Sequence, residues 1–216
     1  MIGTLYLYKV AGEALRTRSI LPYSMVNFYK LPLRISEPDS VYPARFSRAV
    51  VPMMQWADGT VQEESVAIVY ALAELAQKQE RLLGDESLET KSQILQWMCK
   101  FNYDFMKDIA LVFLMNVGRM QFDQGLHDAS LKRVSAYAQY LDKHFTTSKY
   151  LLGNQLTIAD IYGCTFLLRG LQTFMDDEWR SAYPALMKWW SLSASHEVFN
   201  GYFEKIDRVE KYIPPQ

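Results

Sequence analysis

The sequence predicts two domains, a small α/β domain over residues 1–80 and an all-helical domain over residues 91–216. Short strand-like runs occur only in the first part, whereas the second part repeats apolar side chains at helical spacing. Residues 81–90 between them are mostly polar and contain Gly84, a composition typical of a linker. With 216 residues and a hydrophobic content of 50%, the chain is long enough to bury a core in each part.

Strands and helices alternate through the first domain. Residues 3–9 alternate like a strand, and residues 16–30 place apolar side chains at helical spacing. Residues 33–35 read as a short strand that Pro38 ends. Residues 40–48 are expected to form either a loop or a weak helix. This half of the domain is therefore expected to form a β-α-β unit.

A hairpin and a helix complete the first domain. Asp58-Gly59 separates two short runs within residues 51–62, and Asp-Gly between strand-like runs is a strong hairpin signal. Pro52, at the mouth of the first run, marks a special backbone position such as a cis bond. A helix from Ser65 to about Gln77 follows directly. The β-α-β and β-β-α order is thioredoxin-like, with a mixed sheet covered by helices.

The hairpin also brings two binding features together. A helix that starts at Ser65 leaves backbone N–H groups unpaired and points the positive end of its macrodipole outward, and both favour an anion. The strand that begins near Pro52 supplies a backbone edge beside this helix start. Such an arrangement suits a small anionic peptide.

The second domain is expected to be helical throughout. Thr157 and Asp160 form a capping box at the start of one helix, because each can satisfy the backbone N–H of the other. Gly153-Asn154 is expected to end a helical region, and Pro184 to open the last helix. The expected helices cover residues 91–115, 128–145, 157–175 and 184–195.

Charge and composition exclude several classes of protein. A net charge of −1, from 23 basic and 24 acidic residues, argues against a nucleic-acid surface. The apolar run 109–115 is far shorter than the ~20 residues that cross a membrane. Two cysteines without a Cys-x-x-Cys motif suit a reducing cytoplasm. The three histidines have no partner at ligand spacing, so no metal site is expected.

Two motifs then resemble a known family. Val51-Pro52, Asp58-Gly59 and Glu64-Ser65-x-Ala67-Ile68 resemble the glutathione-binding half of a glutathione transferase. The run 156–160, Leu-Thr-Ile-Ala-Asp, resembles the capping box that starts the central C-terminal helix of these enzymes. The resemblance implies the glutathione transferase fold and glutathione as the bound cofactor.

The resemblance also assigns roles to four of these residues. The backbone of Val51, before a cis Pro52, would pair with the cysteinyl part of glutathione. The acidic-Ser pair, Glu64 and Ser65, would grip the γ-glutamyl carboxylate.

Two further residues have open roles. Arg48 either meets the glycine carboxylate of glutathione or is solvated surface. Asp104 either reaches the glutathione of a neighbouring subunit, as a comparable acid does in some relatives, or has a surface or capping role. The family habit and the aromatic residues of 91–115 lead us to expect a homodimer in which the first domain packs on this region.

The residue that activates the thiol remains open among four candidates. These transferases use a side chain near the first strand or the start of the first helix to favour the thiolate. Tyr8, Thr17, Arg18 and Ser19 all lie there. Arg18 and Ser19 rank first, because an Arg beside a thiol favours its charged form. Tyr8 is equally well explained as a strand residue.

One branch of the superfamily shares further motifs with this chain. Residues 92–97, Asn102-x-Asp104 and the run from Glu178 to Trp189 resemble the transferase-like N-terminal module of the gamma subunit of translation elongation factor 1B, especially its fungal forms. The chain ends without the Lys-rich linker and second domain of that subunit, although a truncated form would look the same.

Two functions therefore remain open. The first is a transferase or cis-trans isomerase that activates glutathione for attack on an apolar conjugated electrophile, for example in tailoring a fungal secondary metabolite. The second is a non-catalytic scaffold module of the elongation factor type. The intact Glu64-Ser65 pair favours the enzyme, because a scaffold has no need of a γ-glutamyl clamp.

Overall fold

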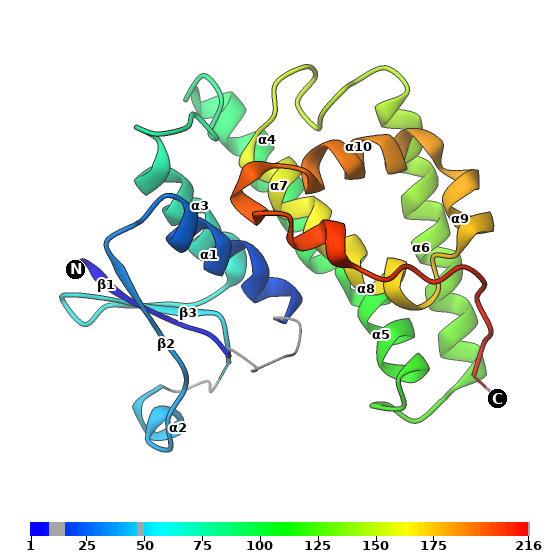
Figure 1. Cartoon of the computed structure of the whole chain (residues 1–216), viewed down its shortest axis with the longest axis horizontal. Helices are drawn as coiled ribbons and strands as arrows, with labels where there is room; N and C mark the ends of the chain where they lie inside the picture. Colours follow the sequence, from blue (N-terminus) through cyan, green and yellow to red (C-terminus); the bar gives the residue numbers. More distant parts are fainter. Residues whose placement is uncertain (9–15, 47–49, 216) are drawn as a thin grey trace.

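An α/β domain and an all-helical domain lie side by side in the computed structural model, as the sequence predicted (Figure 1). The structure describes residues 1–8, 16–46 and 50–215. Within those ranges no helix combines the length and apolar composition needed to cross a membrane.

A four-stranded mixed sheet forms the first domain. Its strands are β1 (Gly3–Tyr6), β2 (Leu33–Ser36), β3 (Met53–Trp56) and β4 (Val61–Gln62), in the spatial order β2-β1-β3-β4. β1 is parallel to β2 and antiparallel to β3, and β3 and β4 form the expected hairpin. This topology confirms the thioredoxin-like order.

Helices cover both sides of this sheet. α1 (Thr17–Phe28) and α3 (Ser65–Ala76) lie between the sheet and the helical domain (Figure 1). Residues 40–48, for which the sequence left a loop or a weak helix as alternatives, contain the short helix α2 (Tyr42–Arg45). Tyr6 packs against α2 with a tilted ring contact of 5.3 Å between its centroid and that of Tyr42, so this region has its own small apolar cluster.

The segment expected to be a polar linker is partly buried. Leu82 and Leu83 are almost fully buried, and the carbonyl oxygen of Leu82 accepts from the N–H of Ile158 at 2.8 Å. The linker therefore docks on the helical domain. The next helix begins at Leu88, earlier than expected, because the side chain of Ser87 caps it by accepting from the N–H of Thr90.

The helix expected over 91–115 is one continuous run with a π-helical segment in its middle. It consists of α4 (Leu88–Cys99), the π segment η1 (Lys100–Phe105) and α5 (Met106–Asn116). Single π turns inside α-helices occur frequently at functional sites. The adjacent α6 (Gln124–Phe145) starts earlier than expected, because Asp123 caps it by accepting from the N–H of Leu126.

The helix expected over 157–175 is divided in three. α7 (Ile158–Cys164) passes through a 3₁₀ turn, η2 (Thr165–Leu167), into α8 (Leu168–Thr173). α7 is close-packed: a β-carbon on Gly163 would lie 2.6 Å from the ring of Phe101, so only glycine fits there.

One predicted helix end was wrong, and one helix was not predicted. Gly153-Asn154 does not end a helix: α6 ends at Phe145, and Gly153 lies in a turn with a φ of +75°. The helix α9 (Asp177–Ala182) was not expected; Asp176 caps it by accepting from the N–H of Trp179.

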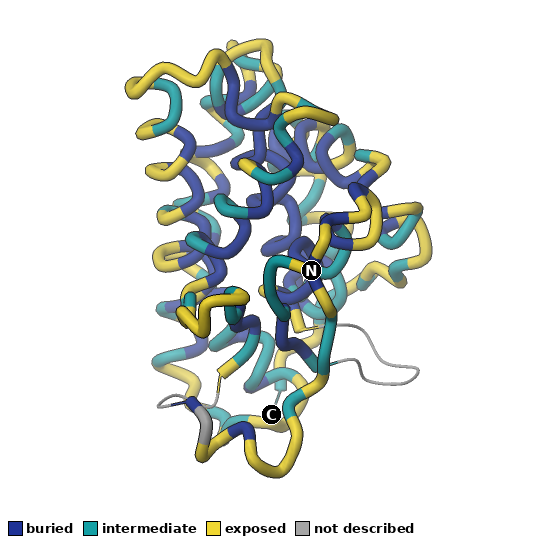
Figure 2. Tube along the Cα trace, turned by 90° about the vertical axis from the view of Figure 1, so that its left-hand side faces the viewer, coloured by how far each residue is buried: buried dark blue, intermediate teal, exposed yellow. Residues whose placement is uncertain are grey.

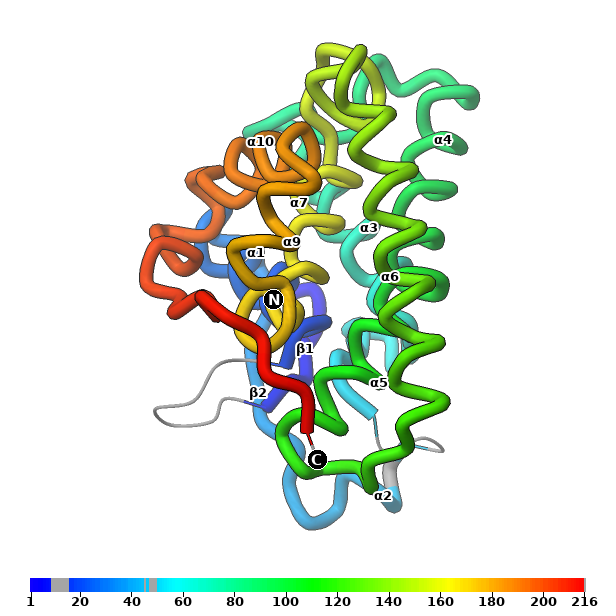
Figure 3. The backbone as a smooth tube through the Cα atoms, turned by 90° about the vertical axis from the view of Figure 1, so that its right-hand side faces the viewer, coloured from blue at the N-terminus to red at the C-terminus, as the bar shows by residue number. Residues whose placement is uncertain are grey.

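The C-terminal part packs back across the helical domain. α10 (Pro184–Ala194) begins at Pro184 as predicted, and the short turns η3 (Glu197–Phe199) and η4 (Tyr202–Lys205) follow. The last residues run past α9 towards the end of α5 (Figure 3). Apart from the small cluster around α2, the buried apolar residues form one continuous core through both domains (Figure 2).

Candidate functional site

A cleft of about 780 Å³ lies where the two domains meet. The first domain lines it with the start of α1 and with the residue that precedes Pro52. The helical domain lines it with α5, the segment after α5, and α8. Three of the residues nominated by the sequence line this cleft together: Thr17, Arg18 and Val51.

The backbone that carries Val51 is held in place by α2. The peptide bond between Val51 and Pro52 is cis, and Pro52 is buried. Just before it, the hydroxyl of Tyr42 donates to the carbonyl oxygen of Val50 at 2.6 Å. Burial raises the pKa of Tyr42 to about 12, so this hydroxyl keeps its proton and remains a donor.

The residue before α3 has an unusual backbone. Glu64 has a φ of +67° and a ψ of 117°, a region that costs a residue with a β-carbon on the order of 1–3 kcal/mol. The hydroxyl of Tyr103, from η1, donates to the Glu64 carboxylate at 2.9 Å. α3 then starts at Ser65, so the N–H groups of its first turn have no partners within the helix.

The hydroxyl of Ser65 is turned towards the helical domain. Ser65 is 3% exposed, and its Oγ lies 2.6 Å from the hydroxyl of Tyr162 and donates to Oδ1 of Asn102 at 3.4 Å. Burial raises the pKa of Tyr162, so its hydroxyl stays protonated and can donate to Ser65. One proton on each hydroxyl then satisfies both contacts.

Arg18 joins the same hydrogen-bonded network from the first domain. Its Nε donates to Oδ1 of Asn102 at 2.7 Å, and its Nη2 donates to the Asn102 carbonyl oxygen at 3.2 Å. Asn102 is 2% exposed and belongs to the π segment η1. A hydrogen-bonded chain therefore runs from Arg18 at the cleft through Asn102 to Ser65 and Tyr162, and it ties the two domains together at this point.

The remaining catalytic candidates lie elsewhere. Ser19 is fully buried, and its hydroxyl has no hydrogen-bond partner among the described residues. Tyr8 lies beyond the end of β1, half-buried, with the guanidinium of Arg16 4.7 Å from the centre of its ring. Neither residue lines the cleft. Arg48, nominated for the glycine carboxylate, lies outside the described residues.

Asp104 faces a different cavity. It is exposed on η1 and lines a hollow of about 470 Å³ between η1 and α6, together with Lys100, Tyr137 and Tyr140. The structure thus separates Asp104 from the cleft of its own chain.

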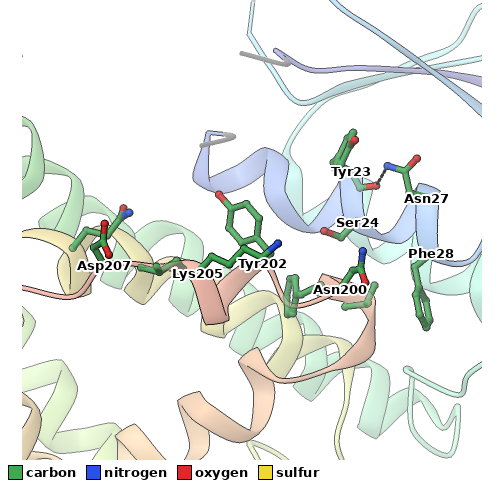
Figure 4. Close-up of a pocket in the computed structure, with 12 residues that line it drawn as sticks. Tyr23, Ser24, Asn27, Phe28, Asn200, Tyr202, Lys205 and Asp207 are labelled. Atoms are coloured by element: carbon green, nitrogen blue, oxygen red, sulfur yellow. Dashed lines mark hydrogen bonds between the residues drawn. The ribbon is translucent and has the colours of Figure 1, made fainter. Parts of the chain in front are cut away.

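A third cavity, of about 700 Å³, lies between α1 and the C-terminal turns (Figure 4). Tyr23 and Asn27 of α1 line one side, and Asn200, Tyr202 and Lys205 line the other. It contains none of the residues that the sequence nominated.

Sequence reasoning missed several residues that build the cleft region. Asn102 was noted only as part of a family motif, although a polar residue between Phe101 and aromatic neighbours on an apolar helix is a usable signal. Tyr103 and Tyr162 gave no such signal, because tyrosines are frequent in this chain. Two further arginines that line the cleft, from the helical domain, were also missed: Arg119 and Arg169.

Comparison with known proteins identifies the family. Residues 92–197 match the family described as glutathione S-transferase, C-terminal domain. A glutathione S-transferase-like protein, LUC7 of Fusarium sp, is 31% identical over 149 residues, which is 69% of this chain and 68% of that protein. The chain belongs to the glutathione S-transferase family.

Within this family the chain is also similar to elongation factors. Elongation factor 1-gamma 2 of Saccharomyces cerevisiae is 28% identical over 99% of this glutathione S-transferase-like chain, which spans only 52% of that protein. The crystal structure of the GST-like domain of elongation factor 1-gamma from the same yeast superposes with a TM-score of 0.86 at 23% identity, and covers 100% of this chain and 99% of that one. A glutathione S-transferase-I bound with lactoylglutathione superposes with a TM-score of 0.74 at 17% identity, covering 93% and 97%. The fold expected from the resemblance is thereby confirmed.

Proposed function

We propose that the cleft binds glutathione and that the chain uses it to attack an apolar conjugated electrophile. The observation that carries this proposal is the meeting of Val51, Thr17 and Arg18 with an apolar wall of α5 in one cavity. Glutathione supplies a thiol that adds to an activated carbon–carbon double bond, which yields a conjugate or, after bond rotation and release of the thiol, an isomer.

The residues present fit a peptide with a carboxylate at each end. The first domain offers the cleft Arg16 and Arg18, and the described residues that line it include no acid. The start of α3 does not line this cavity, but Asn102 connects Ser65 to Arg18, and the helix start supplies N–H groups and the positive end of a helix dipole. Because the Ser65 hydroxyl bonds Tyr162 and Asn102, we assign the γ-glutamyl carboxylate to the backbone N–H groups of this helix start, with Glu64 beside them.

Thr17 and Arg18 are our candidates for activating the thiol. Both line the cleft at the start of α1, on the same side as Val51. Asn102 holds the guanidinium of Arg18 through two hydrogen bonds, so the cation has a fixed position. A fixed cation near sulfur favours the ionised thiol, because the opposite charge stabilises it.

Calorimetric titration should show saturable binding of glutathione to the protein. Replacing Ser65 with alanine should weaken it by about tenfold, because loss of the hydroxyl releases the contacts that position the start of α3. Ser24→Ala, at a residue of α1 that lines the cavity of Figure 4 and not the cleft, should leave binding unchanged. No binding by the wild type at millimolar glutathione would contradict the proposal.

The helical domain would bind the electrophile. Its face of the cleft is apolar where Met106, Ala110, Phe113 and Leu114 line it. A conjugated apolar substrate, such as a fungal secondary metabolite, fits this wall, and the free thiols of Cys99 and Cys164 agree with a cytoplasmic site of action.

A non-catalytic elongation factor module is the second candidate function. Similarity to elongation factor 1-gamma 2 over 99% of this chain favours it. Turnover of a conjugated enone with glutathione separates the two proposals, because the enzyme should catalyse it and a non-catalytic module should not.

We also propose a homodimer formed through α4, η1 and α6. Phe101 and Phe105 are buried in their own chain, so they are not the contact surface. Exposed apolar side chains remain on these helices at Leu95, Tyr103 and Tyr140, which are 36%, 51% and 47% exposed. Tyr140 also lines the hollow that contains Asp104, where a partner would bring its own first domain.

Light scattering at micromolar concentration should therefore give twice the 25.1 kDa mass of one chain. Tyr140→Asp should shift the mass towards the monomer, because it buries a charge in the contact. Ile213→Asp, at an exposed position near the C-terminus, should not. A monomeric wild type would contradict the proposal.

A further inference from the structure

The charges along the cleft are all of one sign among the described residues. Four arginines line it, and no described lining residue is acidic. Arg16 and Arg18 come from the first domain, whereas Arg119 and Arg169 come from the helical domain. The apolar wall of α5 belongs to the same domain as the second pair. The cleft therefore has a cationic group at the side assigned to the electrophile as well as at the side assigned to glutathione.

Arg169 is held in place on α8. Its Nη1 donates to Oε1 of Gln172 at 2.8 Å, and its guanidinium carbon lies 5.3 Å from the centre of the Phe113 ring. These contacts fix the plane of the guanidinium group beside the apolar wall. A fixed guanidinium presents paired donors that match a carboxylate.

The surroundings of Arg169 favour an anion. Burial lowers the pKa of Arg169; Tyr202 acts in the opposite direction, and the like charge of Arg119 adds a smaller effect in the same direction as burial. Arginine nevertheless stays charged at neutral pH. A carboxylate bound between Arg169 and Arg119 would be attracted by both guanidinium groups.

We infer that the electrophile carries a carboxylate, which Arg169 and Arg119 bind while its conjugated body lies along α5; this inference rests on the glutathione-dependent function proposed above. The substrate is thus an amphipathic acid. Its reacting double bond lies nearer to Arg18, and its carboxylate lies at the helical-domain end of the cleft.

A matched pair of probes tests this assignment. The first is 4-(3-oxobut-1-enyl)benzoate, a conjugated enone with a carboxylate, and the second is its methyl ester. The wild type should prefer the acid by about tenfold in kcat/KM, the effect of one charge-assisted contact. Arg169→Met and Arg119→Met should each remove most of this preference, because they should lower kcat/KM for the acid far more than kcat/KM for the ester. Arg34→Met, at an exposed position on β2, is the control and should keep the preference.

Binding measurements separate this inference from the proposed function. Calorimetry with the acid and the ester, without glutathione, should show tighter binding of the acid that both variants lose. If the protein turns over neither probe but binds the acid selectively, the proposed chemistry fails and the carboxylate site stands. Equal affinity for acid and ester, or a rise in the KM for glutathione in the variants, overturns the inference. Thermal unfolding of Arg169→Met detects a purely structural effect of that variant, and Arg119→Met, at an exposed position, tests the same site with less risk to the fold.

Discussion

Replacing Asp160 with alanine should lower the free energy of unfolding by about 3–5 kcal/mol. Asp160 is fully buried in the capping box at the start of α7. Its Oδ2 accepts from the N–H of Thr157 at 2.9 Å and from the Thr157 hydroxyl at 3.1 Å. Its Oδ1 accepts from the N–H of Leu151 and from Nε1 of Trp189, both at 2.8 Å.

The magnitude follows from where these donors lie. Leu151, Thr157 and Trp189 are each at most 3% exposed, so water cannot replace the lost acceptor. Each buried donor left unpaired costs about 1–3 kcal/mol. Burial raises the pKa of Asp160 because desolvation disfavours the charged carboxylate, and its four hydrogen bonds act in the opposite direction. Removing the carboxyl group also removes this cost of desolvation. That gain offsets only part of the loss.

Two further variants give this prediction a scale. Asp160→Asn keeps the size of the side chain but places an NH₂ group against two donors, so it should also destabilise the protein strongly. Asp123→Ala removes an N-cap from the exposed start of α6 and should cost only about 1 kcal/mol. Urea unfolding measures all three. A loss for Asp160→Ala no larger than that for Asp123→Ala would show that the network is dispensable.

Local signals explain why the first domain could be predicted from the sequence. The hairpin at Asp58-Gly59, the special backbone at Pro52 and the helix start at Ser65 each depend on a few neighbouring residues. The capping box of Thr157 and Asp160 is equally local, and it is present. The partners of Asp160 at Leu151 and Trp189 could not be foreseen, because only the folded chain brings them together.

Departures from regular helix geometry left weaker signals. The π segment Lys100–Phe105 and the 3₁₀ turn Thr165–Leu167 keep nearly the same apolar periodicity as an α-helix, so both were hidden within longer helices. The linker also differs from its prediction. Its composition is polar, but Leu82 and Leu83 are buried, and burial depends on the neighbouring helices.

The cleft, too, could be predicted only in part from the sequence. Thr17, Arg18 and Val51 were nominated from family motifs, and the fold brings them together. Asn102 is 84 residues from Arg18 in the chain, and Arg169 is farther still. Contacts of that sequence separation leave no local pattern, so the part of the site supplied by the helical domain required the structure.

If Arg18 activates the thiol, Arg18→Met should lower kcat/KM with glutathione and a conjugated enone by about a hundredfold near neutral pH. The reason is electrostatic, because a cation beside sulfur favours the ionised thiol. Each unit by which the thiol pKa rises on removing that cation corresponds to ~1.4 kcal/mol. The pH profile of kcat/KM should therefore shift to higher pH in Arg18→Met, towards the behaviour of free glutathione.

Asn102 should act through Arg18 as a positioning residue. Asn102→Ala removes both the oxygen that accepts from Nε of Arg18 and a partner of Ser65, and should cost about tenfold with a smaller shift of the pH profile. Asn102→Asp keeps the accepting oxygen and should restore the position of the guanidinium. Its new negative charge beside Arg18 should nevertheless weaken activation, so its pH profile should lie between those of wild type and Arg18→Met.

The decisive comparison is a double-mutant cycle. If Asn102 works only by holding Arg18, the double variant Arg18→Met with Asn102→Ala should be no worse than Arg18→Met alone, because no guanidinium remains to be positioned. Additive losses would mean that Asn102 serves the site independently, through Ser65 and the start of α3. An unshifted pH profile in Arg18→Met, with a shifted profile in Thr17→Val, would transfer the role of activator to the Thr17 hydroxyl. Thermal unfolding of each variant shows whether the domains stay joined, since the same hydrogen bonds connect α1 to η1.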